Sequence, residues 1–202
     1  TGNAVHCNST DTDAVGIMNG SHRAVISSNH IKGCKYGVFG GMLGSLSISS
    51  NYIEGSTTLA DSAGISGGAF LGISWPYSVI NSNVVVNYQN GIIIGDYSSA
   101  TGNSIVSFAS TNNITPGTGG VVPHKTVCIG AESYSSVIGN YCSGYDYGIY
   151  TAATDYKADH NTLTSVETAL NQYMNNVTIA PQAFQDADPN AGAYFTYSGS
   201  SA

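Results

Sequence analysis

The stretch NSNVVVNYQNGIIIGD, residues 81–96, decides the fold because both of its halves recur along the chain. In the first half, Asn83 is followed two residues later by the apolar Val85. In the second half, Gly91 precedes the apolar Ile92, which lies nine residues after Asn83. Recurrence of both halves indicates a chain built from copies of one small structural unit.

The triplet of an Asn, any residue and an apolar residue recurs in phase at Asn3, Asn29, Asn51, Asn83, Asn103, Asn140 and Asn161. The second motif alternates strictly with the first, and its apolar members are Ile17, Val38, Ile65, Ile92, Ile129, Ile149 and Leu170. The shortest repeat is about 21 residues, and insertions lengthen it at a few places. Short strands with turn residues at this period predict a parallel β-solenoid in which each repeat forms one coil.

The repeated segments are β-branched and alternate with period two, as in residues 24–28 and 46–50, which excludes a helical repeat. Asn tolerates the left-handed backbone conformation, so we expect each repeated Asn to form a sharp turn. We also expect its amide to hydrogen-bond to the Asn of the next coil, giving a ladder. The apolar residues two positions later then form an inward stack of Val5, Ile31, Ile53, Val85, Ile105, Cys142 and Leu163.

The composition is that of a β-protein with many turns: 8% of the residues are charged, 42% are hydrophobic, and there are 25 Gly and 14 Tyr. A net charge of −7 with five Lys and Arg excludes an extended basic surface, so nucleic acid is not an expected partner. No apolar run approaches the length of a membrane span, and we expect no membrane insertion.

Cys7, Cys34, Cys128 and Cys142 lack C-x-x-C spacing and are interpreted as buried free thiols. Cys7 and Cys34 fall on adjacent coils, where a disulfide is sterically possible. The five His residues share no column and show no metal-ligand spacing, so we expect no metal and no cofactor. Lys32 and Glu54 follow their Asn by three residues and are expected to form an exposed ion pair between coils.

The pattern S-x-N-x-I followed by Y-G-I/V, seen in residues 28–38 and in related form in residues 139–149, resembles the right-handed parallel β-helices of the pectate-lyase-like superfamily. The resemblance covers residues 3 to about 170 and implies an all-β, right-handed, single-stranded parallel β-helix of about seven coils. We therefore divide the chain into a β-helix, residues 1–170, and a non-repeating segment for capping or association, residues 171–202. The chain begins in mid-coil, which suggests a fragment or module of a longer protein.

Known members of the superfamily include pectate lyases, polygalacturonases, alginate epimerases and bacteriophage tailspikes. The Asn-Thr-Asp, Asp-Asp, Gly-His-Gly and Arg-Ile-Lys elements of polygalacturonases are absent, and the only arginine, Arg23, has no acidic cluster near it in sequence. The chain is closest in style to tailspikes, which are also rich in Gly, Ser, Asn and Tyr. This resemblance implies a homotrimer, located outside the cell or on a virion tail, that binds a bacterial polysaccharide.

The longer gaps flank the strands of the second motif, so the insertions are expected to rim that sheet as a groove for an extended polymer. The longest insertion, residues 106–126, is interpreted as a flexible lip. Aromatic faces stack on sugar rings. The candidate substrate-binding residues are Trp75, Tyr77, Tyr97, Tyr134 and Tyr150.

Asp96 lies four residues after Ile92, and Glu132 lies three residues after Ile129, on what are expected to be neighbouring coils. A coil spacing of about 4.8 Å allows their carboxyl groups to lie roughly 5–10 Å apart, a range that covers retaining and inverting glycosidases. One carboxyl would protonate the glycosidic oxygen while the other attacks or activates water. Asp61, Asp146 and Asp155 are reserve candidates, and all five are also interpretable as solvated turn residues.

The leading hypothesis is a tailspike-type protein that binds and hydrolyses capsule, O-antigen or exopolysaccharide. One alternative is a non-catalytic receptor-binding or structural β-helix of a virion. Another is a polysaccharide lyase or epimerase, which the scarcity of Lys and Arg disfavours because such residues stabilise a uronate carboxylate and the developing carbanion.

Overall fold

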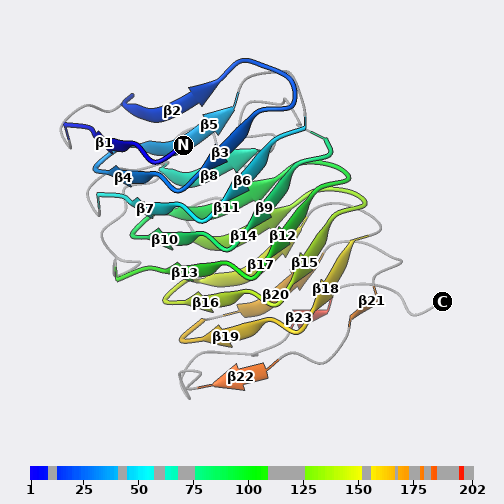
Figure 1. Ribbon diagram of the computed structural model, residues 1–202. Helices are drawn as coiled ribbons and strands as arrows, with labels where there is room; N and C mark the ends of the chain where they lie inside the picture. Colours follow the sequence, from blue (N-terminus) through cyan, green and yellow to red (C-terminus); the bar gives the residue numbers. More distant parts are fainter. Residues whose placement is uncertain are drawn as a thin grey trace.

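The computed structural model shows a parallel β-helix, in which three sheets run side by side from the N-terminal to the C-terminal strands (Figure 1). The residues that the structure describes are 1–8, 13–40, 45–56, 62–67, 76–108, 126–151, 156–166, 168–172, 178–179, 183–185 and 196–197. In this part of the chain every regular element is a β-strand. The predicted fold class is confirmed.

Sheet A consists of β1 (Ala4–His6), β4 (His30–Lys32), β7 (Tyr52–Glu54), β10 (Val84–Val86), β13 (Ser104–Val106), β16 (Tyr141–Ser143), β19 (Thr162–Thr164) and β22 (Ala183–Gln185). Sheet B consists of β2 (Val15–Asn19), β5 (Tyr36–Gly40), β8 (Ala63–Gly67), β11 (Asn90–Ile94), β14 (Val127–Ala131), β17 (Tyr147–Thr151), β20 (Thr168–Gln172) and β23 (Thr196–Tyr197). Sheet C consists of β3 (Val25–Ser27), β6 (Ser47–Ser49), β9 (Val79–Asn81), β12 (Ser99–Thr101), β15 (Ser136–Ile138), β18 (Lys157–Asp159) and β21 (Thr178–Ile179). We number the coils from the N-terminus, so that coil 1 contains β1, β2 and β3.

The strands pair in the register that the repeat predicts. In sheet A, the inward residue of each strand pairs with the inward residue of the next, from Val5 with Ile31 to Cys142 with Leu163. All of these side chains from Ile31 onward are fully buried, and Val5 in the first coil is half-buried. The same holds in sheet B, where Val38, Ile65, Ile92, Ile129 and Ile149 are stacked and fully buried. These columns form the core of the solenoid.

In coils 1–4, close packing requires the glycine that precedes the inward residue of sheet B. A Cβ atom on Gly91 would lie 2.4 Å from Ile105 Cγ2 on the next coil and 2.5 Å from the Cys128 carbonyl oxygen. Gly16, Gly37 and Gly64 approach the inward side chain of the following coil in the same way. We call this set of positions the glycine column.

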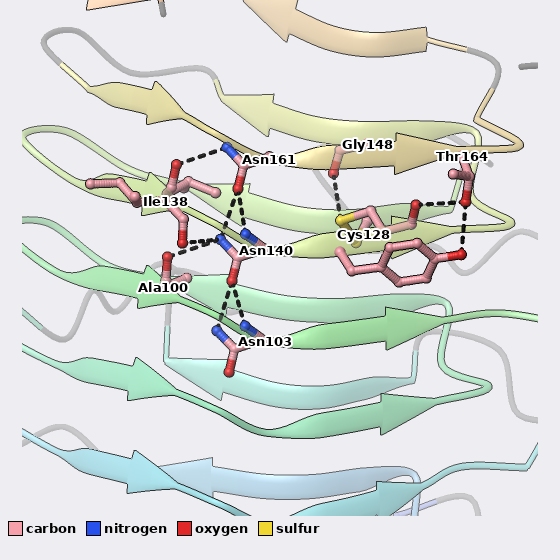
Figure 2. The surroundings of a disulfide bond; sticks show 11 residues. Ala100, Asn103, Cys128, Ile138, Asn140, Gly148, Asn161 and Thr164 are labelled. Carbon is pink, nitrogen blue, oxygen red and sulfur yellow. Dashed lines mark hydrogen bonds between the residues drawn. A yellow bond between two sulfur atoms is a disulfide. The ribbon is translucent and has the colours of Figure 1, made fainter. Parts of the chain in front are cut away.

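The Asn ladder is confirmed. From Asn3 to Asn161, the backbone N–H and the side-chain Nδ2 of each ladder Asn both donate to Oδ1 of the next, at distances between 2.9 and 3.2 Å. Nδ2 also donates to a sheet C carbonyl, as from Asn51 to the Ile26 oxygen at 3.0 Å. Figure 2 shows three rungs, at Asn103, Asn140 and Asn161. Every ladder Asn after Asn3 is buried, so these hydrogen bonds satisfy amides that solvent does not reach.

The expected conformation of the ladder Asn is wrong, because the left-handed residue is the one before it. That position has positive φ at Gly2, Ser28, Ser50, Ser82, Gly102, Gly139 and His160. None of the seven ladder Asn residues has positive φ. The preceding residue therefore makes the turn, and the Asn contributes the hydrogen bonds.

The prediction of free thiols is also wrong, since the structure contains disulfides between Cys7 and Cys34 and between Cys128 and Cys142. Cys128 occupies the glycine column of coil 5, and Cys142 occupies the inward column of coil 6. Elsewhere these two columns bring a glycine against an inward Ile or Val, so two Cys at the paired positions meet directly. Both are fully buried, and the Cys142 sulfur also contacts the Gly148 carbonyl (Figure 2).

Strands also occur after residue 170, in the segment assigned from the sequence to capping or association. β21, β22 and β23 add one strand to each sheet, giving seven complete coils and two strands of an eighth in the described residues. In sheet A, Phe184 is aligned with Leu163 of the preceding coil. Gln182 precedes Phe184 by two residues in the sequence, so this repeat carries Gln where the earlier repeats carry Asn.

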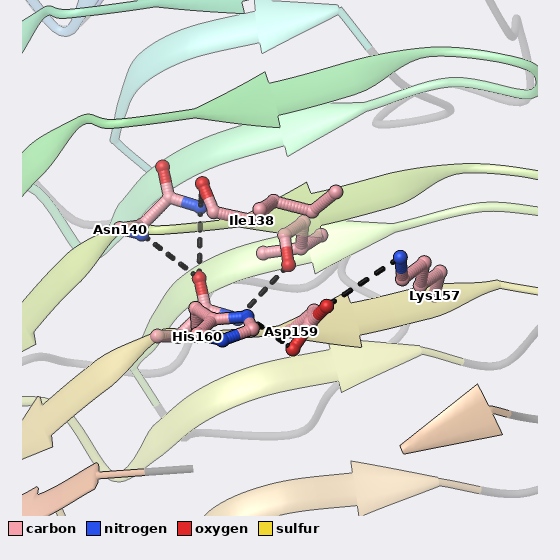
Figure 3. A network of polar contacts seen from close by, with 7 residues as sticks. Ile138, Asn140, Lys157, Asp159 and His160 are labelled. Atoms are coloured by element: carbon pink, nitrogen blue, oxygen red, sulfur yellow. Dashed lines mark hydrogen bonds and ion pairs between the residues drawn. The ribbon is translucent and has the colours of Figure 1, made fainter. Parts of the chain in front are cut away.

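Ion pairs lie on the outer surface of the described part of the chain. The predicted pair between Lys32 and Glu54 is present, with Nζ and Oε1 3.1 Å apart, and it contributes at most about 1 kcal/mol because both side chains are partly exposed. On coil 6, Asp159 contacts Lys157 at 3.4 Å and His160 Nδ1 at 2.5 Å (Figure 3). His160 is the residue that makes the turn before Asn161.

Replacing Asn83 with Ala should lower the free energy of unfolding by about 3 kcal/mol or more, because the change leaves several buried donors without an acceptor. Asn81→Ala is the matched control. Asn81 lies on the half-buried outer side of sheet C, and its loss should cost within about 0.5 kcal/mol. Denaturant unfolding measures both, and equal losses in the two variants would contradict the importance of the ladder.

The double variant Cys128→Gly and Cys142→Ile restores the pair of residue types found at the equivalent positions of other coils. We expect it to be about 2 kcal/mol more stable than the Cys128→Ala and Cys142→Ala double variant, because Ile buries more apolar surface than Ala. Cys142→Ile alone should be less stable than the first double variant, since its side chain meets the Cys128 Cβ. Denaturant unfolding of all three tests this equivalence, and a double Ala variant of equal stability would refute it.

Candidate functional site

Three tyrosines form an exposed stack at the corner between sheets B and C. Tyr77, Tyr97 and Tyr134 follow β8, β11 and β14 on coils 3, 4 and 5. The ring centroids of Tyr77 and Tyr97 lie 5.3 Å apart with the planes inclined by 18°, and those of Tyr97 and Tyr134 lie 4.8 Å apart with 10° between the planes. The side chains are 62%, 51% and 51% exposed. We call this stack the tyrosine column.

The turns that carry the column are in register. Tyr77 N–H donates to the Asp96 carbonyl at 3.1 Å, and Tyr97 N–H donates to the Ser133 carbonyl at 3.0 Å. Each tyrosine is followed by a buried serine whose hydroxyl bonds to the turn backbone. Ser78 N–H donates to Ser98 Oγ at 3.0 Å, for example. The Tyr-Ser dipeptide thus places the serine inside the helix and the tyrosine outside it.

All three tyrosines have left-handed backbones, with φ of 64°, 53° and 57°. For a residue with a Cβ this conformation costs roughly 1–2 kcal/mol, and Gly or Asn would adopt it more readily. Stacking of each ring pair returns about 0.5–1.5 kcal/mol. The stack therefore offsets part of the backbone cost, and stability alone does not explain why bulky aromatic residues occupy all three turns.

The predicted carboxylates lie between the ends of the sheet B strands and the tyrosine column. Asp96 immediately precedes Tyr97, and Glu132 precedes Tyr134 by two residues. Both are half-buried, and they lie on adjacent coils, as expected. Ile94 is aligned with Ala131, and Glu132 N–H donates to the Ile94 carbonyl. Glu132 is therefore aligned with Gly95 and not with Asp96. The two carboxylates are thus offset by one position along the chain.

The reserve residue Asp146 has a structural function in the turn before β17. It is buried, and its Oδ2 accepts hydrogen bonds from Thr126 N at 2.7 Å and Thr126 Oγ1 at 3.0 Å. Asp146 N–H donates in return to Thr126 Oγ1 at 2.9 Å. These bonds join coils 5 and 6. The other candidates Asp61, Asp155 and Trp75 lie outside the described residues.

The predicted binding tyrosines do not all share one place. Tyr150 lies on sheet B and is aligned with Gly130, where it packs against Tyr147 with ring centroids 5.6 Å apart. A similar tilted pair, Tyr36 and Phe39, lies on coil 2 of the same sheet, with centroids 5.4 Å apart. Sheet B therefore has aromatic pairs of its own beside the tyrosine column.

The column geometry changes how these tyrosines can meet a ligand. Face-on stacking of a sugar was expected, but both faces of Tyr97 are covered by Tyr77 and Tyr134. Tyr97 therefore offers its edge and its hydroxyl group. The Tyr-Ser dipeptides on three consecutive coils are the sequence signal for this arrangement.

Neighbouring groups alter the acidity of the column. Partial desolvation, followed by the charges of Tyr134, Tyr77 and Asp96, raises the pKa of Tyr97 above its ordinary value. The neutral phenol is therefore the favoured form, able both to donate and to accept a hydrogen bond.

Comparison of the chain with protein-family models, with curated proteins and with solved structures found no match. Among the described residues, no group of three or more His, Cys, Asp or Glu side chains could hold a metal ion. The same residues contain no helix long and apolar enough to cross a membrane. The candidate site therefore rests on its own geometry.

Wild type should lose more stability than Tyr97→Phe as the pH rises above about 10, the ordinary pKa of tyrosine. A raised pKa means that the folded chain holds the phenol proton more tightly than the unfolded chain does. The associated stability is present below the unfolded pKa and is lost as the pH rises through the folded pKa. Denaturant unfolding at each pH gives the comparison.

Tyr52→Phe, which removes an exposed phenol from sheet A, is the control and should follow wild type. Burial also raises the pKa of Tyr88, Tyr145 and Tyr156, so every variant loses stability in alkali and only the difference reports on Tyr97. Identical pH profiles for wild type and Tyr97→Phe would show that the column does not couple to Tyr97 ionisation.

Proposed function

We propose that this chain binds an extended, neutral polysaccharide along the axis of the β-helix at the tyrosine column. The observation that carries the proposal is the alignment of three exposed phenols, one per coil, with Asp96 and Glu132 beside them. A row of neutral hydroxyls and carboxylates offers donors and acceptors to the hydroxyl groups of a sugar chain.

Periodicity supports a polymer as the ligand. Successive coils repeat at about 4.8 Å, so equivalent groups recur at that interval along the axis. A polysaccharide also presents equivalent groups at regular intervals, and several weak contacts then add along its length. A globular ligand would have no such match.

Charge supports a neutral polymer. The whole chain has five Lys and Arg against twelve Asp and Glu, and the charged residues next to Tyr97 and Tyr134 in sequence are the carboxylates Asp96 and Glu132. A polyanionic glycan would meet repulsion from these carboxylates. The same reasoning favours a hydrolase over a lyase or epimerase, since the latter reactions need cations to stabilise a carbanion.

The two disulfides support a location outside the cell, because disulfides persist in oxidising compartments. Polysaccharides on bacterial surfaces, such as capsule, O-antigen or exopolysaccharide, are accessible there. A tailspike-type virion protein and a homotrimer remain part of this proposal, and both rest on the sequence resemblance.

The enzymatic part of the proposal assigns hydrolysis to Asp96 and Glu132. They occupy adjacent coils at the edge of sheet B, next to the phenols that would hold the sugar chain. One carboxyl would donate a proton to the glycosidic oxygen, and the other would attack the anomeric carbon or activate water.

Tyr97→Ala should weaken binding to a purified neutral capsule or exopolysaccharide by about tenfold. The change removes the contact of the Tyr97 hydroxyl and ring edge with the sugar, and it removes the central ring that aligns Tyr77 and Tyr134. Calorimetry or glycan-array binding measures this change. Tyr52→Ala, at an exposed tyrosine on sheet A, is the matched control and should bind as wild type does. Equal binding by wild type and Tyr97→Ala would refute the column as the binding site.

Asp96→Asn and Glu132→Gln should abolish the release of reducing ends while leaving polysaccharide binding nearly unchanged. Wild type that binds without cutting would support the non-catalytic alternative. An unsaturated product, detected by its ultraviolet absorbance, would instead indicate a lyase. Full activity in both variants would contradict the assignment of these carboxylates.

A further inference from the structure

The tyrosine column also places three phenols where they can react with one another. Tyr97 and Tyr134 are nearly parallel, their centroids lie 4.8 Å apart, and half of each side chain is exposed. Tyr77 extends the same stack at 5.3 Å. Adjacent exposed phenols of this kind are the starting geometry for oxidative coupling between aromatic rings.

We propose that the tyrosine column is a site of covalent dityrosine cross-linking, formed mainly between Tyr97 and Tyr134 when a peroxide and a haem peroxidase supply the oxidising equivalents. The Tyr97–Tyr134 pair is favoured over the Tyr77–Tyr97 pair because its rings are closer and more nearly parallel. This inference rests on the ring geometry and does not depend on the proposed function.

The reaction balances as follows. Each phenol loses one electron and one proton and becomes a neutral phenoxyl radical. The two radicals join through a carbon–carbon bond between their ortho positions, and the hydrogens on those carbons move to the phenol oxygens. The pair thus loses two hydrogen atoms, and one hydrogen peroxide takes up the two electrons and two protons to give two water molecules.

The surroundings favour Tyr97 as the centre of this chemistry. Asp96 immediately precedes Tyr97 in the chain, and its charge is one of the causes that raise the pKa of Tyr97. The turn backbone is held by hydrogen bonds from Tyr77 to Asp96 and from Tyr97 to Ser133, which keeps the rings aligned. A radical formed on Tyr97 therefore has a ring neighbour on each side.

Other tyrosine pairs in the described residues are less suited. Tyr147 and Tyr150 are inclined by 54° with centroids 5.6 Å apart, and both are only partly exposed. Tyr52 is exposed, but its ring makes an edge-to-face contact with the ring of His30. Selective coupling in the column is therefore expected.

The cross-link would fasten coil 4 to coil 5 at the corner between sheets B and C. The disulfides join coil 1 to coil 2 and coil 5 to coil 6. The cross-link would therefore join a pair of coils that neither disulfide joins. All three form under oxidising conditions. The column would thus be a further covalent connection in the environment that also preserves the disulfides.

The test treats the purified chain at low concentration with horseradish peroxidase and limiting hydrogen peroxide. We expect dityrosine fluorescence in the monomer and, by peptide mass mapping, a Tyr97–Tyr134 peptide pair lighter by two hydrogens. Tyr97→Phe retains the ring stack but lacks the central phenol, and its intramolecular product should fall to background. Tyr134→Phe should shift the product to Tyr77–Tyr97.

Tyr52→Phe is the matched control and should give the same yield and the same linked peptides as wild type. The proposal is overturned if Tyr97→Phe yields as much intramolecular dityrosine as wild type. It is equally overturned if the linked peptides map to Tyr52, Tyr141 or the Tyr147–Tyr150 pair, or if dityrosine forms only between molecules.

Discussion

The buried amide ladder is the constraint on which the rest of this structure depends. Asn51, for example, accepts two hydrogen bonds from Asn29 through Oδ1, donates two to Oδ1 of Asn83 and donates one to the carbonyl of Ile26 in β3, so it ties coil 3 to coils 2 and 4 and to β3 of coil 1. A slip of one residue would leave several amides buried without partners, at about 1–3 kcal/mol each. This penalty fixes the register between coils, which short strands of three residues could not do through their backbone bonds alone.

The fixed register decides which residues of successive coils become neighbours. Residues at equivalent places on successive coils become neighbours about 4.8 Å apart, whatever their separation along the chain. Lys32 and Glu54 form an ion pair for this reason, and Tyr97 meets Tyr134 across an insertion of many residues. The turn that carries Tyr97 is held by a backbone hydrogen bond to the turn of the next coil, from Tyr97 N–H to the Ser133 carbonyl.

The repeating part of the fold could be predicted from the sequence because each column obeys one physical demand. Inward positions must be apolar, and the ladder position must carry an amide, so both demands are visible as recurring residue types. The disulfide between Cys128 and Cys142 was missed because each Cys was judged within its own column. The glycine column and the inward column of sheet A both carry Cys at positions that contact each other. That these positions are in contact is known only from the structure.

The tyrosine column was missed for a related reason. Tyr77, Tyr97 and Tyr134 were predicted as separate platforms, and their mutual stacking depends on turns that align only when the ends of the sheet B strands are known. Strand pairing continues after residue 170, where the sequence motif changes and Gln182 stands two residues before Phe184.

The energetics of the column separate it from the repeating scaffold. Ladder and core positions carry residues that lower the free energy of the fold, whereas a left-handed tyrosine raises it by roughly 1–2 kcal/mol. Coil 2 makes the same turn with Ser45 and coil 1 with Arg23, so the corner does not require an aromatic residue. Three adjacent coils nevertheless carry tyrosine there, exposed and stacked. A conformational cost borne at three consecutive turns, on the surface and beside two carboxylates, points to interaction chemistry rather than to stability as the reason for the column.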